Sequence, residues 1–476
     1  MKKQTTIIIV LAILLLVLLG GMAAVIILNQ NHPAVEEDEN LVTEGTFGEF
    51  TDSKTLSDLP VLYGKGMKIG TAFDYGTNDD MIDVSGTTFE DYQNYLVTLE
   101  KDGYKKHSDN GQNGLDDYVY TASFKKDKVS VTVCYVKNQN KTYITGSYRP
   151  LSDHLIYDET KSANYLDGAK TKVHMLQLNE IGNCFIIQLK NGHFVLEDGG
   201  TVADAPYLLD YLEELTPSGE KPVIEAWFIS HAHTDHMGAM QTIINNPTMS
   251  NRIYVEGIYF VEPGPKVLDI ITSEDPSQHV WFVNNSVKSL KNQKGENPQL
   301  YRPHLGERYY FCDVAIEIPL TLEQLTVDSY YAVDFNDTSL WLLHNIEGQR
   351  FLHAGDAGIT ATRMAMSYYD KSFFELDVFS VLHHGINVYD YFTDYCDIKT
   401  LLYTCFRTSS AHEPGTTFAR EAENERLRQS ALEYISHGEG TVVLSFPYKV
   451  GEAEIMPSSD WRYNNGTPKR KALGVE

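Results

Sequence analysis

Three histidines and one aspartate lie within six residues in the segment His231-Ala-His-Thr-Asp-His236, directly after the apolar run Ala226–Ser230. Imidazole nitrogen and carboxylate oxygen are the ligand atoms that Zn²⁺ and similar divalent ions accept. Because a strand that ends in a loop can present alternate side chains to one point, we expect His231 and His233 to share one ion, while Asp235 and His236 reach a second. The alternative is a solvated histidine-rich loop, but chance placement of 16 histidines gives such a cluster in roughly one chain in a thousand.

Three further segments follow the order of a known family. One aspartate ends Val195-Leu-Glu-Asp-Gly-Gly200 before its two glycines, another ends Phe351-Leu-His-Ala-Gly-Asp356, and two histidines stand together in Val381-Leu-His-His-Gly385. With the histidine cluster, these segments resemble the first, second, fourth and fifth motifs of the metallo-β-lactamase superfamily, over roughly residues 171 to 450. The chain looks most like the branch that holds the hydrolase domain of DNA-uptake competence proteins and the choline-phosphate esterases of bacterial surfaces.

The resemblance implies an α/β fold, the αβ/βα four-layer sandwich of that family, with a metal site along one sheet edge. The metal ligands that it implies are His231, His233, Asp235, His236, Asp356 and His384. The cofactor would be Zn²⁺, as one or two ions, with Mn²⁺ or Fe as alternatives because the same ligands suit them.

The resemblance also assigns roles around the ions. Asp198 would orient a metal-binding histidine, and Asp235 would accept a hydrogen bond from the attacking water or bind the second ion. Because adjacent strand residues point to opposite faces, we expect His384 alone to be a ligand. His383 would then bind substrate or donate a hydrogen bond from behind the site.

The third motif departs from the family pattern. Where the family usually has a histidine, the chain reads Asp334-Phe-Asn-Asp-Thr-Ser-Leu340, and the competence-protein branch resembles it in carrying asparagine there. Asn336 or Asp337 would then approach the ion or the substrate, or His304 would fold in as a substitute. His412, which stands before a predicted helix, would bind an anionic phosphate at the helix N-terminus or belong to an ordinary loop.

Residues 1–30 are predicted to be a transmembrane anchor. Ile7 to Leu28 hold no charged residue and would extend about 33 Å as a helix, enough to cross the hydrocarbon core of a bilayer. Because Lys2 and Lys3 precede this run, the positive-inside rule places the rest of the chain outside the cell. A cleaved signal peptide is the alternative, although its apolar core is shorter, about 7–15 residues. Residues 31–58 are acidic and polar, as in a flexible linker.

Residues 59–150 are predicted to form a small α+β domain. Thr87–Glu100 has apolar residues at helical spacing, and a threonine with a following carboxylate can cap its start. Runs rich in Val, Tyr and Thr at Tyr118–Phe124, Lys128–Val136 and Lys141–Gly146 predict an antiparallel meander. We expect the tyrosine-bearing faces of these strands to be half buried.

The hydrolase domain is predicted over residues 165–460. Two amphipathic helices are expected at Asp204–Leu215 and Ala419–Ile435. Residues 262–305 hold Pro263-Gly-Pro265 and many Asn, Gln and Lys, and would form an insertion that flanks the site. The expected strand segments are Val173–Leu178, Cys184–Leu189, His193–Leu196, Arg252–Phe260, Tyr309–Ile318, Thr338–Leu343, Thr400–Cys405 and Thr441–Phe446.

The composition is that of a folded protein with an acidic surface. The formal net charge is −26, from 39 Lys and Arg against 65 Asp and Glu. Because nucleic-acid affinity comes largely from cationic contacts to phosphate, this charge disfavours a nuclease without excluding one. Five cysteines without Cys-x-x-Cys spacing do not predict a disulfide scaffold, and Cys184 and Cys312 are expected to be buried. His344 and His353, which alternate with apolar residues, are expected to be surface or satisfied core positions.

The sequence therefore predicts an extracytoplasmic metal-dependent hydrolase, held in the cell membrane by its N-terminal helix, that needs no Ser or Cys nucleophile. The expected substrate is a phosphodiester or other phosphoester, as a small molecule or on a wall polymer or lipid. A β-lactam fits the third and fifth motifs less well. An extracellular nuclease of the competence-protein type and a non-catalytic surface binding protein on the same fold are the alternatives. The intact His231, His233 and His236 set argues against a di-iron oxidoreductase.

Overall fold

The protein is described here by a computed structural model, which covers residues 41–42, 45–75, 79–111, 113–264, 268, 288–328, 335–406, 421–437 and 439–457. Within these residues no helix has the length and apolar character needed to span a bilayer. The predicted anchor and the beginning of the predicted linker lie outside them.

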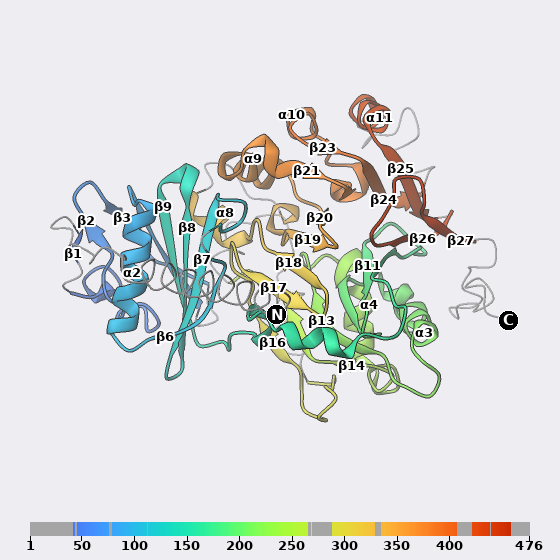
Figure 1. Cartoon of the computed structure of the whole chain (residues 1–476), viewed down its shortest axis with the longest axis horizontal. Helices are drawn as coiled ribbons and strands as arrows, with labels where there is room; N and C mark the ends of the chain where they lie inside the picture. Colours follow the sequence, from blue (N-terminus) through green and yellow to red (C-terminus); the bar gives the residue numbers. More distant parts are fainter. Residues whose placement is uncertain are drawn as a thin grey trace, which may run out of the picture.

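Two mixed sheets form the larger part of the molecule (Figure 1). The strands of the first sheet are β10 (Lys172–Met175), β11 (Cys184–Gln188), β12 (Phe194–Asp198), β13 (Val223–Phe228), β14 (Tyr254–Val255), β15 (Gly257–Tyr259), β16 (Gln299–Tyr301), β26 (Gly440–Ser445) and β27 (Glu454–Pro457). They follow the order β16-β15-β13-β12-β11-β10-β26-β27, with β14 also paired to β13. The neighbours in the half β16-β15-β13-β12 pair in parallel. The neighbours in the half β12-β11-β10-β26-β27 pair antiparallel.

The second sheet repeats this mixture of pairings. Its strands are β17 (Arg308–Phe311), β18 (Val314–Glu317), β19 (Leu342–Ile346), β20 (Gln349–His353), β22 (Val378–Ser380), β24 (Thr400–Phe406) and β25 (Leu432–His437), in that order. β17 to β20 pair antiparallel, and β20 to β25 pair in parallel. The short strands β21 (Glu375–Leu376) and β23 (Asp397–Ile398) form a separate parallel pair. Mixed sheets with interspersed helices confirm the expected α/β class.

Helices accompany both sheets. Figure 1 places α3 and α4 beside the first sheet, and α9, α10 and α11 along the second. The helices of this part are α3 (Ala205–Leu215), α4 (Thr234–Asn245), α5 (Pro247–Ser250), α8 (Leu322–Asp328), α9 (Ile359–Tyr368), α10 (Asp390–Thr393) and α11 (Glu421–Ser430). The two sheets share one apolar core, in which the ring of Phe185 on β11 lies 5.5 Å from that of Phe351 on β20.

A third sheet and one helix form the smaller part. The strands are β3 (Lys68–Ile69), β4 (Phe73–Asp74), β5 (Asp79–Ser85), β6 (Lys105–Asp109), β7 (Val119–Lys126), β8 (Val129–Val136) and β9 (Lys141–Ser147), and β1 (Leu41–Val42) pairs separately with β2 (Tyr63–Gly64). Helix α2 (Phe89–Lys101) begins at Thr88, whose side chain accepts from the N–H of Asp91 while the Asp91 carboxylate accepts from the N–H of Thr88. This capping box confirms the predicted helix start.

The expectation of half-buried faces in this sheet is wrong. Strand β8 is buried at every position after Val129, so both faces are covered. One face packs against α2, while residues such as Cys134 and Tyr143 belong to the core of the larger part. The hydroxyl of Tyr143 lies 2.9 Å from that of Tyr368 on α9. The third sheet therefore lies between α2 and the two larger sheets.

Buried charges join the third sheet to the larger part. Arg149 Nε donates to Asp79 Oδ2 on β5 over 3.0 Å, and Arg302 Nη1 lies 3.8 Å from the same oxygen. Arg302 Nε and His304 Nδ1 reach the two oxygens of Glu323 on α8, at 2.8 Å and 2.9 Å. Because buried ions need partners, this group fixes how the two parts meet.

Several predicted elements differ from the structure. The helix predicted to Ile435 ends at Ser430, because the residues from Leu432 pair in parallel with β24 as strand β25. Helices α4 and α9 were not predicted. The insertion predicted over residues 262–305 contributes β16 to the first sheet, and its residues 265–267 and 269–287 lie outside the described chain. All five cysteines are free, and Cys312, expected to be buried, is partly exposed.

Candidate metal centre

The candidate site lies where strands of both sheets end. β12 ends at Asp198, and β13 leads through Ser230 to His231. His233 precedes α4, so that Asp235 and His236 occupy its first turn rather than a loop. From the second sheet, β20 leads to Asp356, and the turn after β22 carries His383 and His384. The two sheets therefore each supply one half of the site.

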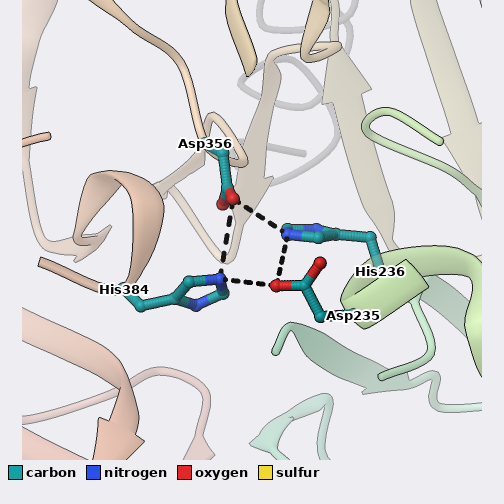
Figure 2. A group of neighbouring side chains, drawn as sticks. All are labelled: Asp235, His236, Asp356 and His384. Atoms are coloured by element: carbon teal, nitrogen blue, oxygen red, sulfur yellow. Dashed lines mark ion pairs between the residues drawn. The ribbon is translucent and has the colours of Figure 1, made fainter. Parts of the chain in front are cut away.

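Four residues face one point in Figure 2: Asp235, His236, Asp356 and His384. His236 Nε2 lies 3.1 Å from Asp356 Oδ2 and 3.8 Å from Asp235 Oδ2. His384 Nε2 lies 3.3 Å from Asp235 Oδ2 and 3.6 Å from Asp356 Oδ2. Ligands bound at about 2.1 Å in a tetrahedron are roughly 3.4 Å apart, so these separations fit a single Zn²⁺-sized ion.

A second group of three residues shares one member with the first. His231, His233 and Asp356 lie together, with His231 Nε2 at 2.8 Å from His233 Nδ1 and at 3.9 Å from Asp356 Oδ2. The ring of Phe335 packs at 4.8 Å against that of His233 on the outer side. Because Asp356 belongs to both groups, its carboxylate is placed to bridge two ions.

Buried polar atoms without partners surround this point. Within the described chain, His236 Nε2, His384 Nε2 and both carboxylate oxygens of Asp356 are buried and make no hydrogen bond. Such atoms normally have partners, since leaving one unpaired costs about 1–3 kcal/mol. A divalent cation would satisfy all of them at once, so the residues present fit a metal ion.

The electrostatics of the site favour the metal-binding forms of Asp356 and His231, but the protonated form of His236. Burial raises the pKa of Asp356, but His236 and His384 lower it more, and the result is well below the usual range. Burial and the neighbouring His236 hold the pKa of His231 well below its ordinary value, which keeps this ring neutral. Burial also lowers the pKa of His236, yet Asp356 and Asp198 raise it well above the ordinary value. Ionised carboxylate and neutral imidazole are the ligating forms, so an ion would have to displace the proton of His236.

Asp198 holds His236 from behind. Its Oδ2 accepts from His236 Nδ1 over 2.7 Å, and its Oδ1 accepts from the N–H of Ser230 over 2.8 Å. The hydroxyl of Ser230 also donates to Asp198 and lies 3.1 Å from His231 Nδ1. These contacts leave the Nε2 atoms of His231 and His236 directed at the site, which is the orienting role that the sequence predicts for Asp198.

Thr404 and Asn183 hold His384 in the same way. The hydroxyl of Thr404 donates to Asn183 Oδ1 and therefore accepts from His384 Nδ1, at 2.9 Å. The backbone N–H of Asn183 donates in turn to the carbonyl of Asp235. One small network thus orients a histidine of the second sheet against the start of α4.

The alternation argument that separated His383 from His384 is wrong. Both residues have left-handed backbone conformations, with φ of 48° and 57°, so they form a turn rather than a strand. Both rings consequently approach Asp356 Oδ2, at 3.5 Å for His383 Nε2 and 3.6 Å for His384 Nε2. His384 alone also meets Asp235, whereas His383 is the more exposed of the two.

The residues considered as the missing third-motif ligand have different surroundings in the structure. His304 lies outside both groups because it pairs with Glu323, so its use as a substitute ligand is wrong. Asp337 Oδ1 accepts from the N–H of Ala361 in the first turn of α9, which gives this carboxylate a structural role. Asn336 Oδ1 is buried and has no hydrogen-bond partner among the described residues, directly after Phe335. His412 lies outside the described chain.

Apart from Asp198, sequence reasoning did not find the residues that orient the ligands. Ser230 and Thr404 are small hydroxyl residues inside strand-like runs, and nothing local marks them. Gly355 has a φ of +51°, and an added Cβ there would lie 2.9 Å from Ser230 Cβ, so a side chain at this position would disturb the orienting serine. The orienting contacts join segments far apart in sequence, which a local pattern does not encode.

Comparison with known proteins places this arrangement in a family. No curated protein matches the chain by sequence. Among solved structures, a metallo-beta-lactamase with a HARLDQ motif from Cronobacter sakazakii is 12% identical, with a TM-score of 0.28 over 48% of this chain and 78% of that one. Zn²⁺-bound PqqB from Methylobacterium extorquens is 10% identical, with a TM-score of 0.33 over 55% of this chain and 89% of that one.

The family model described as the metallo-beta-lactamase superfamily matches residues 179–388. This range contains the six candidate ligands of the two groups and Asp198, which orients His236. The chain therefore carries a domain of the metallo-beta-lactamase superfamily, whose members bind divalent metals, commonly zinc, and are mostly metallo-hydrolases.

Proposed function

We propose that the protein is a zinc-dependent hydrolase that cleaves a phosphodiester or another phosphoester outside the cytoplasm. The observation that carries the proposal is the position of Asp356, whose carboxylate belongs to both groups of candidate ligands. A bridging carboxylate holds two ions at the separation that two-metal hydrolases use for the attacking and leaving oxygens of a phosphoester.

The chain's own residues prepare this chemistry. His231 and His233 would hold one ion, and Asp235, His236 and His384 the other, with Asp356 between them. Divalent ions supply a Lewis acid and lower the pKa of bound water from about 15.7 toward 7. Asp235, which is partly exposed, is placed to accept a hydrogen bond from the attacking water. His383, which is partly exposed and lies 3.5 Å from Asp356 Oδ2, is placed to contact the substrate.

The local charge supports an anionic substrate. With two divalent ions in place, the carboxylates of Asp235 and Asp356 cancel only half of the added charge. The site would then be a positive point on a protein whose formal net charge is −26. A compact phosphoester suits such a site better than a long polyanion, which the surrounding field would repel. Phosphorylated head groups of wall polymers or lipids, as in the choline-phosphate esterase branch, meet this requirement.

A panel of substrates tests the proposal. Purified protein loaded with Zn²⁺ would be assayed on bis-p-nitrophenyl phosphate, p-nitrophenyl phosphorylcholine, single-stranded DNA and a chromogenic β-lactam. We expect hydrolysis of one or both nitrophenyl esters and loss of that activity in Asp356→Ala. Faster cleavage of DNA would support the nuclease alternative, and bound metal without any hydrolysis would support the binding-protein alternative.

The proposed location rests on the N-terminal sequence. The uncharged run Ile7–Leu28 after Lys2 and Lys3 favours a single-pass anchor with the hydrolase domain outside. Membrane fractionation of cells that express the full chain or residues 31–476 tests it, together with protease treatment of intact cells. We expect only the full chain to sediment with membranes and to be cut from outside. A full chain in the soluble fraction would contradict the anchor.

A further inference from the structure

A buried cluster of three ionisable residues lies behind the site and takes no part in the chemistry proposed above. Glu197 immediately precedes Asp198 on β12 and is fully buried. One of its oxygens accepts from His344 Nε2 on β19, and the other accepts from His353 Nδ1 on β20 over 2.8 Å. The cluster therefore joins the first sheet to the second in the middle of their shared core.

The cluster contains a buried carboxylate that two histidines hold. His344 Nδ1 lies 3.0 Å from the carbonyl oxygen of Phe351, which can only accept a hydrogen bond. Burial raises the pKa of Glu197, but His344 and His353 lower it more, to about 2, so Nε2 of His344 also faces an acceptor. Both ring nitrogens of His344 therefore face acceptors, which holds the ring between the backbone of β20 and the carboxylate of Glu197.

Stability alone does not explain a buried carboxylate at this place. The neighbouring side chains of the two sheets are apolar, as the packing of Phe185 against Phe351 shows. Replacing a buried ion pair by apolar residues of similar volume is often neutral or stabilising, and the best-attested use of such a pair is to fix register. Apolar contacts alone are not directional, whereas the two hydrogen bonds to Glu197 fix the position of β12 relative to β19 and β20.

The alignment that the cluster fixes is that of the two halves of the site. On the first sheet, the residue after Glu197 is Asp198, whose carboxylate holds His236. On the second sheet, His353 ends β20 just before Asp356, and its Nε2 lies 3.9 Å from Asp198 Oδ2. His236 is thus hydrogen-bonded to the chain neighbour of Glu197, and Asp356 follows His353 by three residues. The two ligands that meet across the site, His236 Nε2 and Asp356 Oδ2 at 3.1 Å, are therefore both closely linked to the cluster.

We propose that Glu197, held by His344 and His353, is a positioning residue that sets the distance between the ligands of the first sheet and those of the second. This inference rests on the proposed metal centre. It assigns Glu197 no contact with substrate or ion, and it predicts that the geometry of a bound ion changes when the carboxylate is removed.

The test compares two glutamates of the same sheet, of which Glu197 is buried and Glu225 is partly buried. Glu197→Gln keeps the shape of the side chain and removes its charge. Glu225→Gln is the matched control, because Glu225 on β13 accepts from His193 and Asn191 near the start of β12, at the end of the strand away from Asp198. Co²⁺ replaces Zn²⁺ in the full-length protein, its affinity is measured by competition with a chromogenic chelator, and its visible absorption reports the ligand geometry.

We expect Glu197→Gln to weaken Co²⁺ binding by about 10–100-fold, the range found when partners behind metal ligands are lost, and to shift the absorption bands. Glu225→Gln should keep the parent affinity and spectrum even if both variants melt at a lower temperature. Should Glu197→Gln not fold, His353→Gln gives the same reading, because it replaces the rigid ring that ties β20 to Glu197 by a flexible side chain.

The outcomes separate the two proposals. A parent protein that binds Co²⁺, with Glu197→Gln or His353→Gln binding it equally well and with an unchanged spectrum, would overturn the positioning role and leave the metal centre intact. Equal weakening in Glu197→Gln and Glu225→Gln would also overturn it, because a general loss of stability would then explain the effect. A parent protein that binds no Co²⁺ would overturn the proposed function and this inference together.

Discussion

The Nδ1 atom of His384 donates a hydrogen bond to the hydroxyl of Thr404 over 2.9 Å, and this contact decides which ring nitrogen faces the candidate metal centre. The single hydroxyl proton of Thr404 is used on Asn183 Oδ1, so Thr404 can only accept from the ring. The Nδ1 side of the ring is therefore fixed against Thr404, and Nε2 is the nitrogen directed at Asp235 and Asp356.

The first prediction follows from this contact. Thr404→Val removes the acceptor while keeping the volume of the side chain, and Thr404→Ser keeps the hydroxyl. We expect Thr404→Val to weaken Zn²⁺ binding by about 10–100-fold, because the ring of His384 is no longer oriented. Thr404→Ser should stay close to the parent. Calorimetric titration of the metal-free proteins measures both, and equal affinities for the Val and Ser variants would refute the orienting role.

The second prediction concerns the number of ions. Asp356 belongs to both groups of ligands, whereas Asp235 belongs to one. Asp235→Asn should therefore reduce the bound Zn²⁺ from two ions to one per chain. Asp356→Asn should weaken both sites by about 100-fold or more, because loss of a direct ligand exceeds the effect of a residue behind it. Elemental analysis after gel filtration gives the stoichiometry. Identical metal contents for the two variants would contradict a shared bridging carboxylate.

The third prediction concerns removal of the ion. His236 Nε2, His384 Nε2 and the Asp356 oxygens are buried without hydrogen-bond partners in the described structure, so an ion that binds only the folded state should stabilise it. At a free Zn²⁺ concentration about 1,000 times the Kd, the gain in unfolding free energy is about 4 kcal/mol. Calorimetric melting with chelator, and then with restored Zn²⁺, checks this. A melting temperature that changes neither with chelator nor with restored Zn²⁺ would argue against an ion at this position.

The candidate ligands could be predicted from the sequence to different degrees. His231, His233, Asp235 and His236 are close together in the chain, so their spacing alone indicates a metal site. Asp356 and His384 were identified only through resemblance to family motifs. Their approach to the first four residues depends on how the two sheets pack, which no local pattern encodes.

The failures have specific physical causes. The alternation argument for His383 and His384 assumed a strand, but two consecutive left-handed residues place both rings against Asp356. The helix predicted through Ile435 was overridden beyond Ser430 by pairing of β25 with β24, since hydrogen bonds between strands outweigh a weak helical preference. Glu197 and Thr404 act through partners on other strands, so neither could be recognised without the fold.

The last prediction concerns the pH dependence of the contact between the third sheet and the larger part. Burial raises the pKa of Glu323, but His304 and Arg302 lower it more, from 4.5 to about 2. A carboxyl with a depressed pKa stabilises the fold above its unfolded value of about 4.5, and this contribution disappears as the pH falls toward 2. The partner behaves oppositely, because burial lowers the pKa of His304 but Glu323 raises it more, above 6.5. The stabilisation from His304 is therefore full below 6.5 and is lost as the pH rises through the folded value.

Glu323→Gln should consequently destabilise the protein at pH values above about 4.5, by about 3 kcal/mol, because Arg302 and His304 then lose the buried carboxylate to which both are hydrogen-bonded. The difference in melting temperature between parent and variant should shrink as the pH falls from 4.5 and become small near pH 2, where about half of the parent carboxyl is protonated in the folded state. Circular dichroism melts across this range measure it, with Glu296→Gln as a control at an exposed glutamate that should leave the melting temperature unchanged. If the difference persisted undiminished at pH 2, the loss would come from packing rather than from the charge of Glu323, and the buried ion group would not be what holds the third sheet in place.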